Sequence, residues 1–132
     1  MTPVAQDWLG ICRRASAGVE AALERYPKIA DRSVATGSRG EGGDRTLVID
    51  SVAEDAIFAE LESLGVGLTA VSEERGHVPI AGGGPIHVVI DPIDGSRNAR
   101  RRMPLYAVSI AVADGDTMGD VAFGFVKDLG CG

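Results

Sequence analysis

The sequence predicts an α+β fold in which two N-terminal helices pack on one face of a mostly antiparallel sheet. Two observations lead to this prediction. Apolar residues recur at intervals of three and four in the N-terminal part of the chain, as in amphipathic helices. The later part contains short runs of β-branched residues separated by glycine-rich turns, as in strands. A length of 132 residues fits a single domain, residues 1–132.

The first helix is predicted from Trp8 to Tyr26, and Pro27 ends it because proline disfavours a helical residue before it. Its apolar stripe comprises Trp8, Ile11, Cys12, Ala15, Val19, Ala22, Leu23 and Tyr26. The segment Thr36–Gly43 is polar and rich in glycine, which predicts a mobile loop.

The second helix is predicted to open at Ser51, with Glu54 completing a Ser-x-x-Glu capping box. Its buried stripe comprises Val52, Ala56, Ile57, Leu61 and Leu64. Gly65 suits the C-terminal end of the helix. Asp50 then lies just before the helix, where its carboxylate can be aimed without joining the helical hydrogen bonds.

Four strands follow from the β-branched runs. A short strand is expected at Leu68–Val71, and the glycine-rich segment Ala81–Pro85 connects it to the next strand, His87–Asp91. The runs Tyr106–Ala113 and Gly119–Val126 are expected to form a hairpin.

Composition excludes several classes of protein. The net charge of −6 argues against a nucleic-acid polymer as partner, since phosphate contacts need excess basic residues. No apolar run is long enough for a membrane span, and no signal peptide is visible. Cys12 and Cys131 are expected to be free thiols in a reducing compartment. A cytoplasmic protein is therefore expected.

The segment His87–Ser96 is the most informative part of the chain. An apolar run stops at Asp91 and Asp94, with the rigid Pro92 between them. Gly95 then allows a tight turn with free backbone N–H groups. Two carboxylates on a stiff turn can share hard cations, and the amides that follow can hold a phosphate. This pattern predicts a metal-dependent phosphate site, although an isolated Asp-x-x-Asp is also typical of a solvated turn.

The sequence Asp-Pro-Ile-Asp-Gly-Ser at Asp91–Ser96 resembles a motif of the inositol monophosphatase family, which includes archaeal-type fructose-1,6-bisphosphatases. Val71–Gly76 is similar to that family's Gly/Ser-Glu-Glu, and Gly43–Asp50 is similar to its Asp-x-Thr-x-x-x-Asp. The resemblance runs from about Trp8 to Gly132. It implies the N-terminal half of a layered αβαβα sugar-phosphatase fold.

The resemblance implies Mg²⁺-dependent hydrolysis of a small phosphate monoester by a metal-activated water, with two or three Mg²⁺ ions or with Mn²⁺ in their place. It gives Asp91 the bridging role between ions. It places Glu73 and the backbone carbonyl of Ile93 on the first ion and Asp94 on the second.

By the same resemblance, Asp50 and Ser96 orient and deprotonate the attacking water, and Thr46 supports Asp50 through its hydroxyl. The backbone amides of Gly95 and Ser96 would bind the substrate phosphate. Thr46 is, on its own, an equally good strand residue. Relatives commonly dimerise, and the sequence leaves a homodimer open for this chain.

Members of the family are longer and carry a later Trp-Asp-x-Ala-type motif, whose Asp is a further metal ligand. This motif is absent here. We therefore expect a truncated chain that is a poor enzyme on its own.

Several alternatives stay open at the level of function. Inositol phosphate, fructose 1,6-bisphosphate and a nucleotide 3′-phosphate are all substrates within the family. A haloacid-dehalogenase-type hydrolase needs Asp-x-Asp, whereas Asp91 and Asp94 are separated by two residues. A catalytically silent metal- or phosphate-binding fragment is the alternative outside enzymes.

Overall fold

The computed structural model describes residues 6–26, 35–39, 45–94 and 106–129. Within these ranges it contains helices, one short 3₁₀ helix and two sheets. The elements are α1 (Trp8–Glu24), β1 (Ala35–Arg39), β2 (Arg45–Leu47), α3 (Val48–Ser63), β3 (Leu68–Ser72), β4 (Gly76–Ile80), β5 (His87–Asp94), β6 (Ala107–Ala113), η2 (Met118–Asp120) and β7 (Val121–Asp128).

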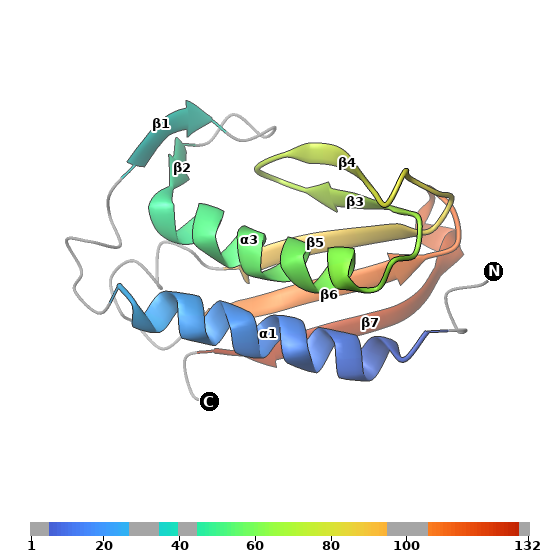
Figure 1. Ribbon diagram of the computed structural model, residues 1–132, viewed down its shortest axis with the longest axis horizontal. Coiled ribbons are helices and arrows are strands. Elements are labelled where there is room, and N and C mark those ends of the chain that lie inside the picture. Colours follow the sequence, from blue (N-terminus) through green and yellow to red (C-terminus); the bar gives the residue numbers. More distant parts are fainter. Residues whose placement is uncertain (1–5, 27–34, 40–44, 95–105, 130–132) are drawn as a thin grey trace.

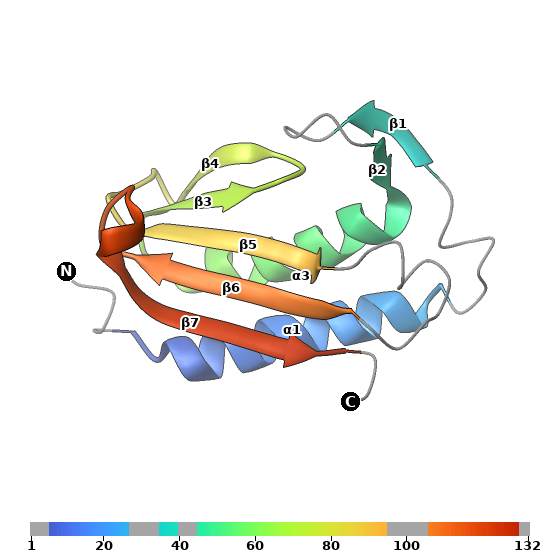
Figure 2. The same cartoon turned by 180° about the vertical axis from the view of Figure 1, so that it is seen from behind.

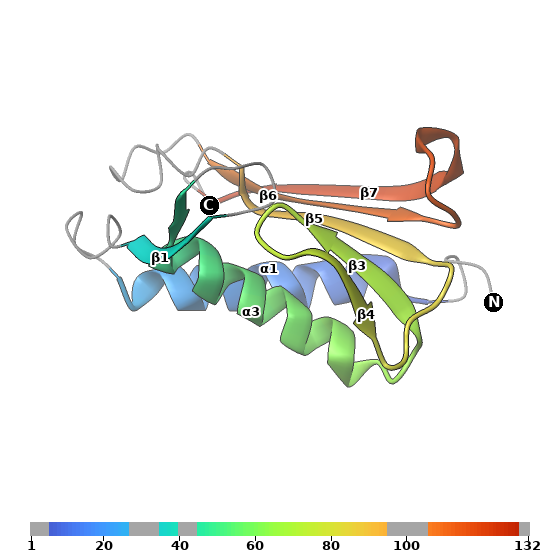
Figure 3. The same ribbon diagram turned by 90° about the horizontal axis from the view of Figure 1, so that it is seen from above.

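The main sheet has the strand order β4-β3-β5-β6-β7, and β1 pairs with β2 in a separate two-stranded sheet. Within the main sheet only β3 and β5 are parallel, and the other neighbours are antiparallel. Helices α1 and α3 lie side by side on one face of this sheet (Figures 1 and 3). The view from behind shows the other face without a helix from the described part of the chain (Figure 2). The predicted α+β class is confirmed.

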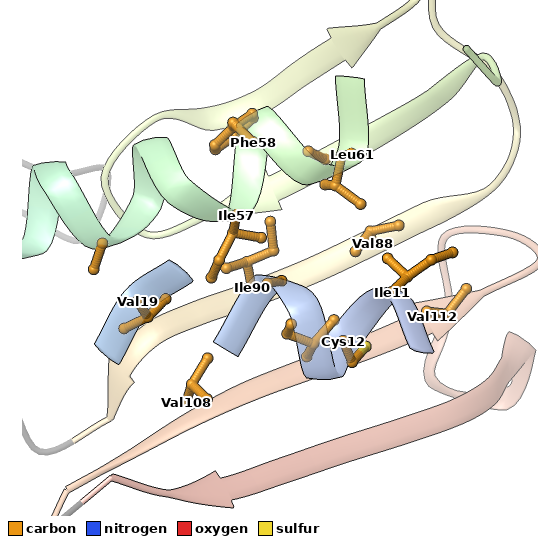
Figure 4. Close-up of a cluster of buried hydrophobic side chains, with 14 of the residues drawn as sticks. Ile11, Cys12, Val19, Ile57, Phe58, Leu61, Val88, Ile90, Val108 and Val112 are labelled. Carbon is orange, nitrogen blue, oxygen red and sulfur yellow. The ribbon is translucent and has the colours of Figure 1, made fainter. Parts of the chain in front are cut away.

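The core lies between the two helices and the sheet (Figure 4). Helix α1 contributes Ile11, Cys12 and Val19, and alternate residues of the central strands, such as Val88 and Val108, point toward them. Burial raises the pKa of the Cys12 thiol to about 11, so this cysteine is a packing residue. No helix in the described ranges is long and apolar enough to cross a membrane.

Helix α1 agrees with the predicted first helix at its start and ends at Glu24, two residues before the predicted end. Asp7 caps it, because the Gly10 N–H donates a hydrogen bond to Asp7 Oδ1 at 3.1 Å. Pro27, the predicted stop, lies outside the described residues.

Helix α3 begins at Val48, three residues before the predicted start, so the Ser51–Glu54 capping box is wrong. The reason is a tertiary contact that outweighs the local one. The Glu54 side chain is buried and accepts a hydrogen bond from Ser72 instead of returning to the helix terminus. Asp50 consequently lies in the first turn of the helix and not before it. At the other end, Gly65 has a φ of 67°, as expected after a helix.

The strands differ from the prediction in several places. Strand β2 was not predicted, and β7 begins at Val121, after the 3₁₀ helix η2, and not at Gly119. Residues 36–39 of the predicted loop Thr36–Gly43 belong to β1, and its remainder lies outside the described residues. Strand β4 was not predicted. Its Pro79 argues against a central strand, and β4 is indeed at the edge of the sheet. Strand β5 continues beyond Asp91 to Asp94. The β6–β7 hairpin is confirmed.

Candidate functional site

Two parallel strands deliver the predicted metal ligands to one edge of the sheet. The register of β3 and β5 pairs Ser72 with Ile90, so Glu73 and Asp91 are the next residues of each chain segment. Glu73 begins the turn between β3 and β4. Because the strands are parallel, their carboxyl ends lie at the same end of the sheet, which we call the β3–β5 edge. Figures 1 and 3 show it near the N-terminal part of α3.

A β-bulge determines how the two aspartates of β5 are presented. Asp91 pairs with Ser109 and Asp94 with Ala107, so three steps along β5 match two steps along β6. In a regular strand, residues three apart point to opposite faces. Here Pro92 and the following residue are both buried, whereas Asp91 is half-buried and Asp94 is exposed. The extra residue therefore keeps both carboxylates out of the core.

The carboxylates of this edge act on one another. Burial, together with the negative charges of Asp94 and then Glu73, raises the pKa of Asp91 to about 6. A hydrogen bond from the Ile93 backbone N–H opposes it, and Glu74 contributes a further upward effect. A carboxyl group near two others is harder to ionise. The structure thus brings Glu73, Asp91 and Asp94 close enough for their charges to interact.

The donor set at this edge fits a hard divalent cation. In the described part of the chain, no three His, Cys, Asp or Glu side chains stand close enough to hold a metal ion as they are arranged. However, the candidate donors are carboxylate oxygens and, from the family resemblance, the Ile93 carbonyl, and Mg²⁺ and Mn²⁺ prefer oxygen ligands of these kinds. A cation would also offset the repulsion that raises the pKa of Asp91. Glu73, Asp91, Ile93 and Asp94 are the residues that could hold it.

The other predicted site residues are placed less completely. Asp50 is 7% exposed in the first turn of α3, at the same end of the molecule as the Asp94 end of β5 (Figures 1 and 3). Thr46 lies in β2, directly before α3. Gly95 and Ser96 lie outside the described residues, so their roles stay predictions.

Sequence reasoning missed a polar network behind Glu73. Glu54 of α3 has a fully buried side chain that contacts Ser72 and Arg75, which flank the Glu73–Glu74 dipeptide. A signal for it exists in the sequence. Glu54 precedes the buried Ile57 by three residues, so a charged residue falls within the apolar stripe of the helix.

The raised pKa of Asp91 predicts how the metal-free chain responds to pH. Because the folded-state pKa, about 6, exceeds the ordinary value of 3.8, the folded chain binds more protons than the unfolded chain between these values. The free energy of unfolding should therefore fall as pH rises from about 4 to about 6. Burial raises the pKa of Glu54 as well, which acts in the same direction.

The measurement is the melting temperature against pH, in EDTA and in excess Mg²⁺. We expect Mg²⁺ to raise the melting temperature above pH 6 and to have little effect near pH 4, where a proton competes at Asp91. The same Mg²⁺ effect at both pH values would contradict the assignment of Asp91 as a ligand.

Comparison with known proteins identifies relatives of the entire described fold. Residues 6–129 match the profile of the inositol monophosphatase family. The fructose-1,6-bisphosphatase/inositol-1-monophosphatase of Methanothermobacter thermautotrophicus is 37% identical over 134 aligned residues, which cover 95% of this chain and 48% of that protein. The protein of the same name from Archaeoglobus fulgidus is 36% identical and is covered to the same extent, 48%.

Solved structures show the same fold. A crystal structure described as an inositol monophosphatase–fructose 1,6-bisphosphatase superposes with a TM-score of 0.74 and 27% identity, over 94% of this chain and 46% of that one. The Thermotoga maritima inositol monophosphatase gives a TM-score of 0.71 at 24% identity, over 96% and 46% of the two chains. The chain thus spans about half the length of the relatives it matches.

Proposed function

The chain belongs to the inositol monophosphatase family, and from this premise we propose that it takes part in the Mg²⁺-dependent hydrolysis of a small phosphate monoester. One observation supports this proposal most. The carboxyl ends of the parallel strands β3 and β5 bring Glu73, Asp91 and Asp94 to one edge, where burial and then the charges of Asp94 and Glu73 raise the pKa of Asp91.

In the proposed site, Glu73, Asp91, Asp94 and the carbonyl of Ile93 would hold the cations. When bound, Mg²⁺ would supply a polarised water and neutralise the phosphate oxygens. Asp91 is given the shared position because it is the most buried of the three acids and lies near enough to both others for their charges to act on it. The bulge at Pro92–Ile93 keeps its carboxylate and that of Asp94 available together.

The remaining residues act on water and substrate. We assign to Asp50 the removal of a proton from the attacking water, with Ser96 as its partner and Thr46 as support. Placement in the first turn of α3 holds the Asp50 carboxylate on a rigid element. The backbone N–H groups of Gly95 and Ser96 would donate hydrogen bonds to the phosphate oxygens, as consecutive amides commonly do.

The substrate class is proposed from the relatives. Two of them carry names that combine fructose-1,6-bisphosphatase and inositol-1-monophosphatase, so a phosphorylated polyol or sugar is the expected substrate. A nucleotide 3′-phosphate is an alternative substrate. A cytoplasmic location and a homodimer stay predictions.

The experiment is a phosphate-release assay of the chain on inositol 1-phosphate and fructose 1,6-bisphosphate, with saturating Mg²⁺ and with EDTA. We expect release that depends on Mg²⁺. Release that persists in EDTA would contradict the proposed chemistry. Mg²⁺ binding without phosphate release from either substrate would favour the other candidate, a metal- or phosphate-binding fragment. The support for this candidate is that the chain covers 48% of the length of its relative.

A further inference from the structure

The side chain of Glu54 is fully buried, which is costly for a carboxylate unless it is paired. It lies on α3, and its partners come from the segment at the end of β3. Oε1 accepts a hydrogen bond from the Ser72 hydroxyl at 2.7 Å and lies 3.0 Å from Arg75 Nε. Burial raises the pKa of Glu54, and the Ser72 hydrogen bond and the Arg75 charge oppose that effect. Glu54 therefore ties the end of β3 to the helix.

Arg75 is held against α3 at three positions. Besides Glu54, its guanidinium pairs with Asp55, and its Cζ lies 4.8 Å from the centre of the Phe58 ring. Phe58 lies between α3 and the β3–β4 hairpin (Figure 4). A planar guanidinium can make an ion pair at its edge and stack on an aromatic ring with its face. Arg75 thus anchors the second side of the turn on the same helix.

Glu73 and Glu74 lie in the sequence between these two anchored residues, Ser72 and Arg75. Ser72 precedes them and Arg75 follows them, and the Arg75 backbone N–H donates to Ser72 Oγ at 3.1 Å. The same hydroxyl therefore closes the turn and connects it to Glu54. Side chains that are not themselves proposed metal ligands therefore fix the backbone on both sides of Glu73.

We propose that Glu54 and Arg75 are positioning residues, which hold the turn so that the Glu73 carboxylate faces the edge where Asp91 lies. This inference rests on the proposed function, in which Glu73 is a metal ligand. Glu54 follows Asp50 by four residues, one helical turn along the same face. Helix α3 thereby connects Asp50, which is assigned to the attacking water, with the turn that carries the proposed ligand Glu73.

The test compares Mg²⁺ affinity, measured by calorimetry, in Ser72→Ala, Arg75→Met and Glu54→Ala. Loss of residues that orient a metal ligand typically weakens affinity by about 10- to 100-fold, and we expect a loss in this range. Glu54→Gln keeps an acceptor oxygen for both partners and should recover most of the affinity that Glu54→Ala loses. Ser72→Ala serves if Glu54→Ala does not fold, because it removes only one hydroxyl.

The matched control is Arg14→Met. Arg14 of α1 pairs with Glu60 of α3 at 2.6 Å, and its side chain is 57% exposed. Its loss therefore removes an ion pair between the two helices that involves neither Ser72 nor Arg75. Its Mg²⁺ affinity should be unchanged. A second readout needs no metal: hydrogen exchange of the Arg75 amide should speed up in Ser72→Ala and not in Arg14→Met.

The outcomes separate the two proposals. Normal Mg²⁺ affinity in folded Ser72→Ala and Arg75→Met would overturn the positioning role and leave the metal site intact. Absence of Mg²⁺ binding by the unsubstituted chain would overturn the proposed function and the positioning role with it.

Discussion

Substitution of Asp91 by Asn should weaken Mg²⁺ binding at least about tenfold or abolish it, because the amide removes one anionic donor from the ligand set. The same change should raise the melting temperature of the metal-free chain. Ionised Asp91 is partly buried and repelled by Asp94 and Glu73, and Asn carries no charge. A variant that is more stable and yet does not bind the metal cannot owe its defect to unfolding.

Two matched variants sharpen this experiment. Asp94→Asn should have a smaller effect on affinity than Asp91→Asn, since Asp94 is exposed and is assigned to one ion only. Asp116→Asn removes an exposed carboxylate from the β6–β7 turn, which lies at the opposite end of the sheet, and should leave affinity unchanged. The measurement is the Mg²⁺ affinity of all three variants, by calorimetric titration at pH 7.5. Unchanged affinity in Asp91→Asn would exclude it as a ligand.

In a version of the protein extended to the length of its relatives, substitution of Asp50 by Asn should lower kcat by a factor of about 10² to 10⁴, the range expected for loss of a general base. Its Mg²⁺ affinity should change much less, because Asp50 is assigned to the water. The side chain is almost completely buried and Asn has nearly the same shape, so the helix should be retained. Steady-state kinetics and calorimetry on the same preparation give both quantities.

Glu62→Gln is the control for this second experiment, since Glu62 is an exposed acid on the same helix. Its kcat should equal that of the unsubstituted extended protein. If Asp50→Asn instead loses Mg²⁺ binding and shows no separate decrease in kcat at saturating metal, Asp50 is a metal ligand and its assigned role is wrong.

Helices and most strands could be predicted because their signals are local. The stripe of α1 and the β-branched runs of β5 and β6 depend only on residue spacing. The start of α3 could not be predicted in this way, because Glu54 has two competing partners. The local rule assigns it to a capping box with Ser51, whereas in the fold it bonds with Ser72, eighteen positions later in the chain. Only the tertiary contact between α3 and β3 decides which of the two partners Glu54 bonds with.

The motifs predict which residues form the candidate site, but not how the fold presents them. Asp91, Asp94 and Glu73 are predicted from motifs as metal ligands, and the structure places them at one edge, while their role as ligands stays a prediction. The sequence suggested that the strand ends at Asp91, but a bulge carries it on to Asp94. Such a bulge becomes recognisable only when the pairing with β6 is known, because it is a difference between two strands.

Paramagnetic broadening by Mn²⁺ tests most directly the claim that the β3–β5 edge is a divalent-cation site. Substoichiometric Mn²⁺ is added to the isotopically labelled chain, and the amide resonances are followed by NMR. We expect selective broadening at residues 73–75, 91, 93 and 94, persistence of the resonances of residues 114–120 at the opposite end, and loss of the broadening in Asp91→Asn. Broadening centred on another part of the fold, or equal broadening in Asp91→Asn, would contradict the account.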